Sequence, residues 1–218
     1  MRAYLRAADL PQIIPVFPLD GAILLPGGEL PLRIFEPRYL NMIDDAMAEN
    51  RVIGMIQTRV GGDIARPRLA DVGCAGRITS YAETSEGTYL ITLTGVCRFK
   101  PALELTVNAP YRQVRARYDD FADDLDRETP EPAEPDRTRF ATALKRYLNR
   151  RELDIDWDSV RDAPAEALVT SLAMGLPFDP AEKQALIEAP GPARRFEVLV
   201  ALLEIDAMDA DDEPRPLQ

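Results

Sequence analysis

The stretch LLPGGELPLRIFEPRYLNMIDDAM, residues 24–47, contains a turn, an apolar segment and a change to helical spacing in immediate succession. Pro26, Gly27 and Gly28 are residue types that mark a turn. The apolar segment that follows, residues 30–35, is interrupted by one arginine and predicts a strand. The order of these signals indicates that the chain turns, runs extended and then enters a helix.

A helix is predicted immediately after this strand. Pro37 suits the first helical position, where the absence of a backbone N–H costs nothing. Apolar residues then recur at intervals of three and four, while Asp44, Asp45 and Glu49 fall on the opposite side. The apolar stripe consists of Tyr39, Met42, Ile43, Ala46 and Met47. Asn50 is the predicted end of the helix.

The charged residues Glu36 and Arg38 flank Pro37 and could form a reactive acid beside a substrate clamp. No second acid or nucleophile can be placed next to them, so we interpret them as the joint between strand and helix. Arg38 is then expected on a solvated or interdomain face. The positions expected in or near the core are Leu32, Ile34 and Tyr39. Replacing Phe35 or Pro37 should therefore lower stability before it alters binding.

The composition excludes several classes of site. The chain has 218 residues, of which 46% are apolar, which is enough for one large or two small globular domains. It has no histidine, which excludes Ser-His-Asp and Cys-His catalysis and every zinc site that needs histidine. Two cysteines cannot build a four-cysteine zinc site. Neither a P-loop nor a G-x-G-x-x-G fingerprint is present. We predict no enzymatic activity, no catalytic residue, no metal and no cofactor.

The expected location is the cytoplasm. No run of 18 or more residues is free of charge, so no membrane-spanning helix and no membrane partner are predicted. The first 17 residues lack the continuous apolar region of a secretory signal. Two cysteines also exclude a secreted scaffold held by several disulfides.

The net charge of −11 is concentrated in two segments. Residues 119–136 carry nine acids and one arginine, and residues 204–218 carry six acids and one arginine. Because both segments are expected to be mobile, the folded body is close to neutral. The acidic composition therefore gives little information about partners.

The first ~118 residues are predicted to be mainly strands with one helix, which favours a barrel or a sandwich. The turn between the two central strands is predicted at ETSEG, residues 83–87. Prolines 11, 15 and 18 favour sheet edges or bends. The segments with strand character are residues 13–17, 22–25, 30–35, 52–58, 72–81, 88–94, 96–99 and 111–118.

A second, helical part is predicted after an acidic, proline-rich linker at residues 119–136. Asp136 can cap a helix over residues 137–149, and Pro164 lies early in a helix that runs to Gly175. Asp179, Pro180 and Glu182 form a strong helix start. A last helix is predicted from apolar residues that recur at i, i+3, i+4 and i+7, namely Phe196, Leu199, Val200 and Leu203. The predicted organisation is a β-domain at residues 1–118, the linker, an antiparallel helical bundle at residues 137–207 and a disordered acidic tail at residues 208–218.

Cys74 and Cys97 lie on the two strands of the predicted hairpin. An ideal register would place them opposite each other, but the pattern predicts a bulge at Gly95. The first alternative is a redox pair. The second, which we favour, is two small apolar side chains buried in a sheet.

The segment YRQVRARYDD, residues 111–120, combines three arginines with two aromatic residues, the composition of a nucleic-acid-binding strand. Arg115 and Arg117 share one face of the predicted strand, and Arg112 lies on the other. A solvated face is the simpler interpretation. Nucleic-acid binding gains support if these three arginines and Arg98 converge on one exposed surface.

Three stretches in succession resemble the N-terminal, substrate-recognition domain of Lon proteases. They are PVFPLDGAILLPGGELPLRIFEPRYLNMIDDAM, residues 15–47; GCAGRITSYAETSEGTYLITLTGVCRF, residues 73–99; and LVTSLAMGLPFDPAEKQALIEAP, residues 168–190, with Thr170 where asparagine is usual. The family-signature residues, expected to be mainly structural, are Pro26, Gly27, Pro31, Leu32, Ile34, Phe35, Glu36, Pro37, Arg38, Tyr39, Gly95, Arg98, Phe99, Pro177, Phe178, Glu182, Lys183 and Gln184.

The resemblance implies an α+β fold, in which a PUA-like β-barrel encloses one helix and an α-helical bundle follows. It also implies a free-standing, non-catalytic module without the ATPase and protease domains. Such a module would bind unfolded or client polypeptides and could bridge them to a protease or chaperone. A sheet edge or an apolar groove between barrel and bundle could receive the client. The alternatives are an RNA-binding PUA-like protein and a barrel that binds a small molecule in its cavity.

Overall fold

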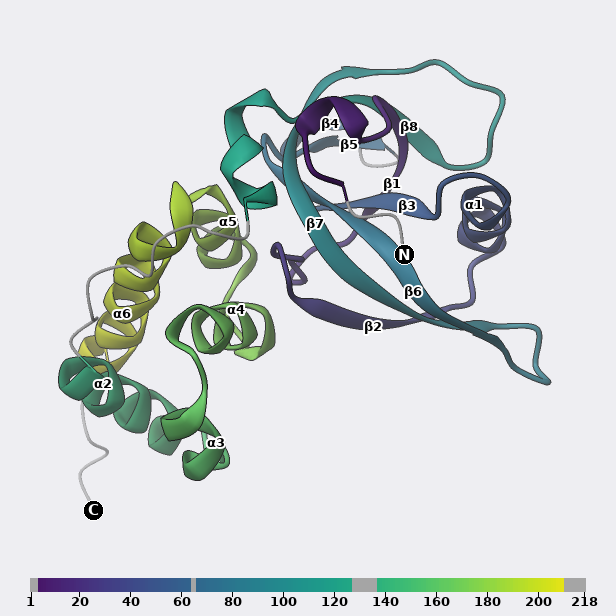
Figure 1. Ribbon diagram of the computed structural model, residues 1–218. Helices are drawn as coiled ribbons and strands as arrows, with labels where there is room; N and C mark the ends of the chain where they lie inside the picture. Colours follow the sequence, from purple (N-terminus) through teal and green to yellow (C-terminus); the bar gives the residue numbers. More distant parts are fainter. Residues whose placement is uncertain (1–3, 64–65, 127–136, 210–218) are drawn as a thin grey trace.

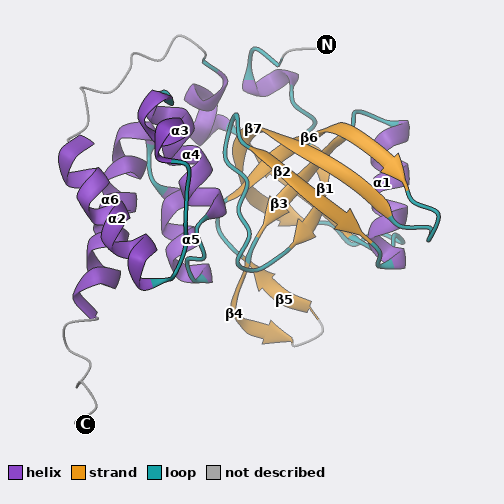
Figure 2. Cartoon of the chain, turned by 90° about the horizontal axis from the view of Figure 1, so that it is seen from below, coloured by secondary structure: helices purple, strands orange, loops and turns teal. Residues whose placement is uncertain are grey.

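The computed structural model describes residues 4–63, 66–126 and 137–209, and it has the mixed α+β content that the sequence predicts (Figure 1). Strands dominate up to residue 117 and helices dominate from residue 137. Seen from below, the helices after residue 137 gather on one side of the strands, helix α1 (Pro37–Ala48) lies on the other side, and a separate two-stranded hairpin projects from the strand region (Figure 2). Buried apolar residues of both parts form one continuous core cluster.

Six strands form the main sheet, in the order β2-β7-β6-β3-β1-β8. Strand β7 also pairs with β8, so five strands, β7, β6, β3, β1 and β8, form a closed circuit of pairings. Strand β2 pairs with β7 and ends the strand order. The bounds are β1 Ile13–Pro18, β2 Glu29–Ile34, β3 Val52–Ile56, β6 Gly73–Glu83, β7 Tyr89–Glu104 and β8 Arg112–Arg117. The projecting hairpin, absent from the sequence prediction, is β4 Thr58–Asp63 with β5 Arg66–Leu69.

The two strands predicted on either side of Gly95 are one continuous strand, β7. The pairing of β6 with β7 shifts register where Gly95 lies opposite Gly76. A Cβ atom added at Gly95 would lie 2.0 Å from the carbonyl oxygen of Leu25. Glycine is therefore required because the neighbouring chain passes too close for any side chain.

Residues 22–25, which have strand character in the sequence, are not a strand. Ile23, Leu24 and Leu25 are nevertheless at most 2% exposed. The segment begins after Gly21, which has a φ of +76°, and ends at the Pro26–Gly28 turn. These residues are apolar because they are buried in the core. An apolar run of four residues does not show whether the segment is a buried strand or a buried segment without strand pairing.

Helix α1, Pro37–Ala48, begins where the sequence predicts, with Glu36 as N-cap and Pro37 as first residue. Its buried face consists of Tyr39, Met42, Ile43 and Ala46, while Asp44 and Asp45 are exposed. One face of the helix is therefore buried and the other is exposed, whereas the resemblance implied a helix enclosed by a barrel. The helix lies against the strands with its polar face toward solvent, because a helix of this amphipathic composition can bury only one side.

Five α-helices follow the strands in the described part of the chain: α2 Arg137–Arg150, α3 Trp157–Asp162, α4 Ala165–Gly175, α5 Pro180–Glu188 and α6 Gly191–Asp209. The short helix α3 was not predicted. The start of α5 is confirmed: Asp179 accepts a hydrogen bond from the Glu182 backbone N–H, and Glu182 accepts one from the Asp179 N–H. Helix α6 packs against α2, α4 and α5.

The first part of the predicted linker is structured. Residues 119–125 form a 3₁₀ segment, η2 (Asp119–Leu125), which packs on β7 and buries Phe121. A second 3₁₀ segment, η1 (Ala7–Asp9), lies near the start of the chain. Composition did not indicate η2 because one aromatic residue, Phe121, and one buried ion pair, Arg98–Asp124, anchor an otherwise acidic segment. Residues 127–136 of the predicted linker and 210–218 of the predicted tail lie outside the described residues.

Candidate functional site

A groove of about 670 Å³ lies between the strand region and the helices. One wall is the turn and the first half of β2, and the other is α4 with the residue that precedes it. The lining residues are Pro26, Gly27, Gly28, Glu29, Leu30, Pro31, Pro164, Glu166, Ala167, Thr170, Ser171, Met174 and Gly175. The volume falls in the range of clefts that bind ligands.

The two walls touch at the bottom of the groove. A Cβ atom at Gly28 would lie 2.4 Å from Sδ of Met174 and 3.1 Å from Cγ2 of Thr170. Gly28 and Thr170 are buried, whereas Pro31 and Ser171 are exposed. The groove is therefore closed below by close packing and open above.

The strand wall has a free edge at β2. The Gly95 N–H donates to the Gly28 carbonyl at 2.8 Å, so the backbone of Gly28 faces β7. The backbone groups of successive residues point alternately toward and away from the partner strand, so those of Pro31, three residues later, point away from β7. Proline has no N–H to offer at that edge, which prevents a continuous ladder with another strand. This edge of β2 is consequently poorly suited to the addition of another strand.

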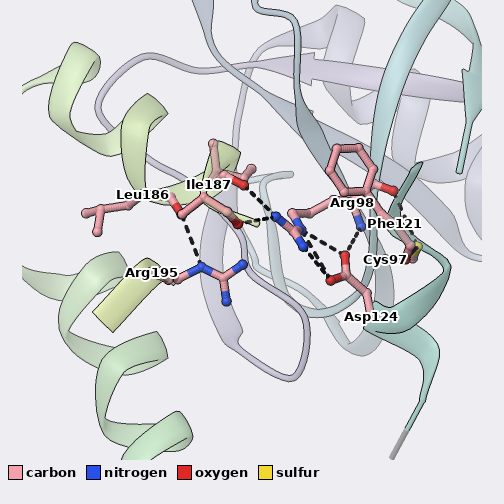
Figure 3. A network of polar contacts seen from close by, with 8 residues as sticks. Cys97, Arg98, Phe121, Asp124, Leu186, Ile187 and Arg195 are labelled. Atoms are coloured by element: carbon pink, nitrogen blue, oxygen red, sulfur yellow. Dashed lines mark hydrogen bonds and ion pairs between the residues drawn. The ribbon is translucent and has the colours of Figure 1, made fainter. Parts of the chain in front are cut away.

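The groove keeps its shape because the strands and helices are fastened at Arg98, which is 3% exposed. Its guanidinium and its own backbone N–H donate to the carboxylate of Asp124 in η2 at 2.8–3.2 Å. Nη1 donates to the carbonyls of Ile187 at 3.1 Å and Ala189 at 2.7 Å. Figure 3 shows Arg98 between Asp124 and the end of α5. These carbonyls are at a helix C-terminus, where a cation is favoured.

A second buried arginine, Arg195 of α6, lies in the same region (Figure 3). Its Nε donates to the Leu186 carbonyl at 3.1 Å. Burial, and then the charge of Arg98, lower the pKa of Arg195 to about 10. Arg195 thus joins α6 to α5, while Arg98 joins α5 to the strands.

Two amide side chains add a second connection. Gln57, at the end of β3, donates to the Pro180 carbonyl at 2.9 Å and to Gln184 at 3.1 Å. Gln184 donates in turn to the Val72 carbonyl at 3.1 Å. Helix α5 is therefore fixed to the strands at both ends.

Lys183 connects α5 to the helical wall of the groove. It is 2% exposed, and its ammonium donates to the carbonyls of Ala173 at 3.0 Å and Met174 at 2.6 Å, at the end of α4. Burial lowers the pKa of Lys183 to about 8. The signature segment around residue 183 thus positions α4, although it does not line the groove.

The structure separates the predicted signature residues into three groups. Pro26, Gly27 and Pro31 line the groove. Ile34, Tyr39, Phe99 and Phe178 are buried, and Leu32 is partly buried. Arg98, Lys183 and Gln184 form the connections described above. Glu182 caps the start of α5, and Pro177 is exposed. The groove residues contributed by α4 were missed, because no local pattern in α4 marks the positions that face β2.

Glu36 and Arg38 lie at the junction of strand and helix, as expected, whereas the position of Phe35 differs from the expectation. Arg38 pairs with Glu36 at 2.8 Å and lies over the Tyr39 ring at 4.6 Å. Phe35, however, is 66% exposed, so its burial gives no reason to expect that its replacement lowers stability. It follows the last residue of β2, and its side chain does not enter the core.

The arginines considered for nucleic-acid binding do not converge. Arg112 is held by Glu104 at 2.7 Å and by the Pro67 carbonyl at 2.9 Å. Arg117 pairs with Asp120 at 3.1 Å, and Arg98 is buried. Arg115 alone of the four is exposed without an ion pair in the described residues. The strand provides no continuous cationic surface.

The two cysteines are reduced and buried, and each is 0% exposed. Cys74 lies opposite Arg98, and Cys97 lies opposite Ala75, so the two thiols are one residue out of register. Side chains alternate along strands, which directs the two thiols to opposite faces. Burial raises the pKa of Cys97 to about 12 and raises that of Cys74 well above its usual value. The arrangement does not fit a redox pair.

Two further observations concern the described residues. They contain no group of three cysteine, aspartate or glutamate side chains arranged to hold a metal ion. Within the same ranges, no helix combines the length and apolarity needed to cross a membrane.

Comparison with known proteins identifies similar sequences. A family model described as the ATP-dependent protease La (LON) substrate-binding domain matches residues 13–204. Lon protease 2 of Myxococcus xanthus is 33% identical over 110 residues, which cover 49% of this chain and 13% of that protein. Lon protease 2 of Sorangium cellulosum is 24% identical over 197 residues, which cover 87% of this chain and 24% of that protein. The chain thus spans about an eighth to a quarter of the length of these relatives.

Two solved structures share the fold. The Lon N-terminal domain protein from Xanthomonas campestris superposes with a TM-score of 0.61 at 24% identity, over 87% of this chain and 97% of that one. The N-terminal domain of the Mycobacterium avium complex Lon protease gives a TM-score of 0.56 at 19% identity, over 88% and 98%.

Proposed function

Since the chain belongs to the ATP-dependent protease La (LON) substrate-binding domain family, we propose that it is a non-catalytic module that binds apolar segments of unfolded polypeptides. The proposed site is the groove between β2 and α4. In this proposal the module acts in the cytoplasm and either holds clients or presents them to a protease or chaperone.

One observation carries the choice of site: the groove is open to solvent, while its floor and walls are fixed by buried contacts. Pro26, Pro31, Pro164 and Met174 supply apolar surface along it. Thr170 and Ser171 offer hydroxyl groups, and the turn before β2 offers backbone atoms. The flexible methionine side chain accepts varied apolar groups without demanding one shape. Such a lining suits clients that share apolarity rather than sequence.

We also propose that the closed circuit of strand pairings is a PUA-like barrel and that α2–α6 pack as a bundle. The support is the pairing of β7 with both β6 and β8, together with the packing of α6 against α2, α4 and α5. In this arrangement the groove follows the boundary between barrel and bundle.

The two alternative functions receive less support. The RNA-binding alternative requires a cationic face, and three of its four candidate arginines are paired or buried. The small-molecule alternative requires an open barrel cavity. Ile14, Val114 and Phe99 are each 0% exposed and belong to the continuous core. Ile14 is paired with Val114, and both Ile14 and Phe99 would contact a Cβ atom at Gly54, so these side chains share one face and fill the space inside the circuit of strands.

Filling the groove tests the proposal. Ala167 and Ser171 are exposed lining residues, so Ala167→Trp or Ser171→Trp narrows the groove without entering the core. We expect affinity for a chemically unfolded client to fall at least about tenfold, corresponding to about 1.4 kcal/mol. Ala201→Trp is the matched control, since Ala201 is exposed on α6 and does not line the groove.

Fluorescence anisotropy with a labelled, permanently unfolded client measures the affinity, and circular dichroism verifies folding. Unchanged affinity in both groove variants contradicts the proposed site. Equal binding of the folded and unfolded forms of the same client contradicts the proposed function.

A further inference from the structure

Two carboxylates stand at the groove from opposite walls. Glu29 is the first residue of β2, and Glu166 lies in the first turn of α4. Both line the groove and both are exposed. None of the lining residues is a lysine or arginine. An occupant therefore meets apolar surface with negative charge on both sides.

Neither carboxylate is neutralised by an ion pair within the described residues, whereas several other exposed acids are. Glu86 pairs with Arg33 at 2.6 Å, and Asp71 pairs with Arg59 at 2.7 Å. Glu166 does act electrostatically on Arg195, but Arg195 is 4% exposed and forms no ion pair with it. Two carboxylates remain available to a ligand.

We propose that the groove selects apolar polypeptide segments that carry a lysine or arginine. This inference rests on the proposed function and names the client chemistry at the same site. The apolar side chains of the segment lie against Pro31 and Met174, and its cationic group lies at the rim beside Glu29 or Glu166. Lysine and arginine suit this position because their long aliphatic stems cover apolar surface while the charge stays in water.

Each carboxylate is expected to raise the affinity for a cationic segment modestly, and the two together are expected to raise it measurably. Exposed ion pairs are worth about 0.2–1 kcal/mol, which corresponds to about 1.4- to 5-fold in affinity for each carboxylate. Two favourable contacts therefore raise the affinity by about 2- to 25-fold. The preference should weaken with added salt, because the contacts are at the solvent-exposed rim.

Three peptides that share one apolar core and differ only in flanking residues test the inference. The flanks are lysine, serine or glutamate, and anisotropy gives the dissociation constant of each for the full chain. We expect affinity in the order lysine, serine, glutamate. In Glu29→Gln/Glu166→Gln the three affinities should converge while the serine peptide still binds.

The control variant Glu83→Gln/Glu152→Gln removes the same net charge at exposed positions outside the groove and should keep the order. Equal affinities in the unmodified chain, or an order that survives in the Glu29/Glu166 variant, overturn this inference and leave the proposed function standing. Failure of all three peptides to bind overturns both.

Discussion

Replacing Asp124 by asparagine removes the charge that neutralises the buried guanidinium of Arg98. Arg98 and Asp124 side chains are 4% and 9% exposed, and their closest contact is 2.8 Å. The substitution preserves volume, so the change in stability reports the charge rather than a cavity. Arg98 also binds the carbonyls of Ile187 and Ala189, so its guanidinium cannot turn to solvent without breaking the strand–helix connection.

The magnitude follows from burial. Breaking one partner of a buried ion pair costs about 3–5 kcal/mol, because the other charge remains desolvated and unpaired. For a chain of this length, 1 kcal/mol shifts the melting temperature by about 2–4 °C. We therefore expect Asp124→Asn to lower the melting temperature by about 6–20 °C. The matched control is Glu86→Gln, which removes the charge from the Arg33–Glu86 pair, whose side chains are 57% and 71% exposed. That change should cost less than about 1 kcal/mol.

Urea denaturation of both variants gives the free energies of unfolding. Because Arg98 connects β7 to the end of α5, Asp124→Asn should also reduce the protection of α5 amides against hydrogen exchange. A loss for Asp124→Asn no larger than that for Glu86→Gln would refute the claim that this pair fastens strands to helices.

Three further predictions concern other buried positions. Gly95→Ala should lower the free energy of unfolding, measured by urea denaturation, by about 1–3 kcal/mol, because its Cβ atom would lie 2.0 Å from a backbone oxygen. Gly175→Ala should change it little, because no atom lies within 4 Å of the added Cβ. Equal effects of the two substitutions would contradict the close approach at Gly95. Burial lowers the pKa of Lys183 from 10.5 to about 8, so between pH 8 and pH 10.5 the unfolded chain binds a proton that the folded chain does not. The free energy of unfolding should therefore rise with pH over this range, by up to about 3 kcal/mol relative to Lys183→Met. A difference between the two proteins that does not change with pH would refute this linkage. Cys74 and Cys97 should resist alkylation in the folded chain and label fully after unfolding, and mass spectrometry that detects an intramolecular disulfide after mild oxidation would contradict their placement on opposite faces.

Local chemistry predicted the joint around Pro37 and the start of α5 correctly. In both places the signal is complete within a few residues: proline at the first helical position, or Asp179 and Glu182 satisfying each other's backbone N–H groups. Such features depend little on the rest of the fold, which is why they can be recognised without it.

Features that depend on distant partners were not predictable. The continuity of β7 through Gly95 is set by the chain around Leu25, and η2 is anchored by Asp124 on Arg98. The groove combines residues 26–31 with residues 164–175, so neither segment indicates it alone. The sequence analysis interpreted the residues of the opening stretch as mainly structural, and the turn and the first half of β2 in that stretch form one wall of the groove.

Site-specific cross-linking tests the central claim most directly, namely that unfolded polypeptides occupy the groove between β2 and α4. Because Cys74 and Cys97 are buried, Ser171→Cys can be labelled selectively in the folded chain with a photoreactive group, and Ala201→Cys provides the matched surface control. We expect the probe at residue 171 to cross-link an unfolded client and not its folded form, with little reaction at residue 201. Equal cross-linking from both positions, or none from residue 171 under conditions where the client binds, would contradict the account.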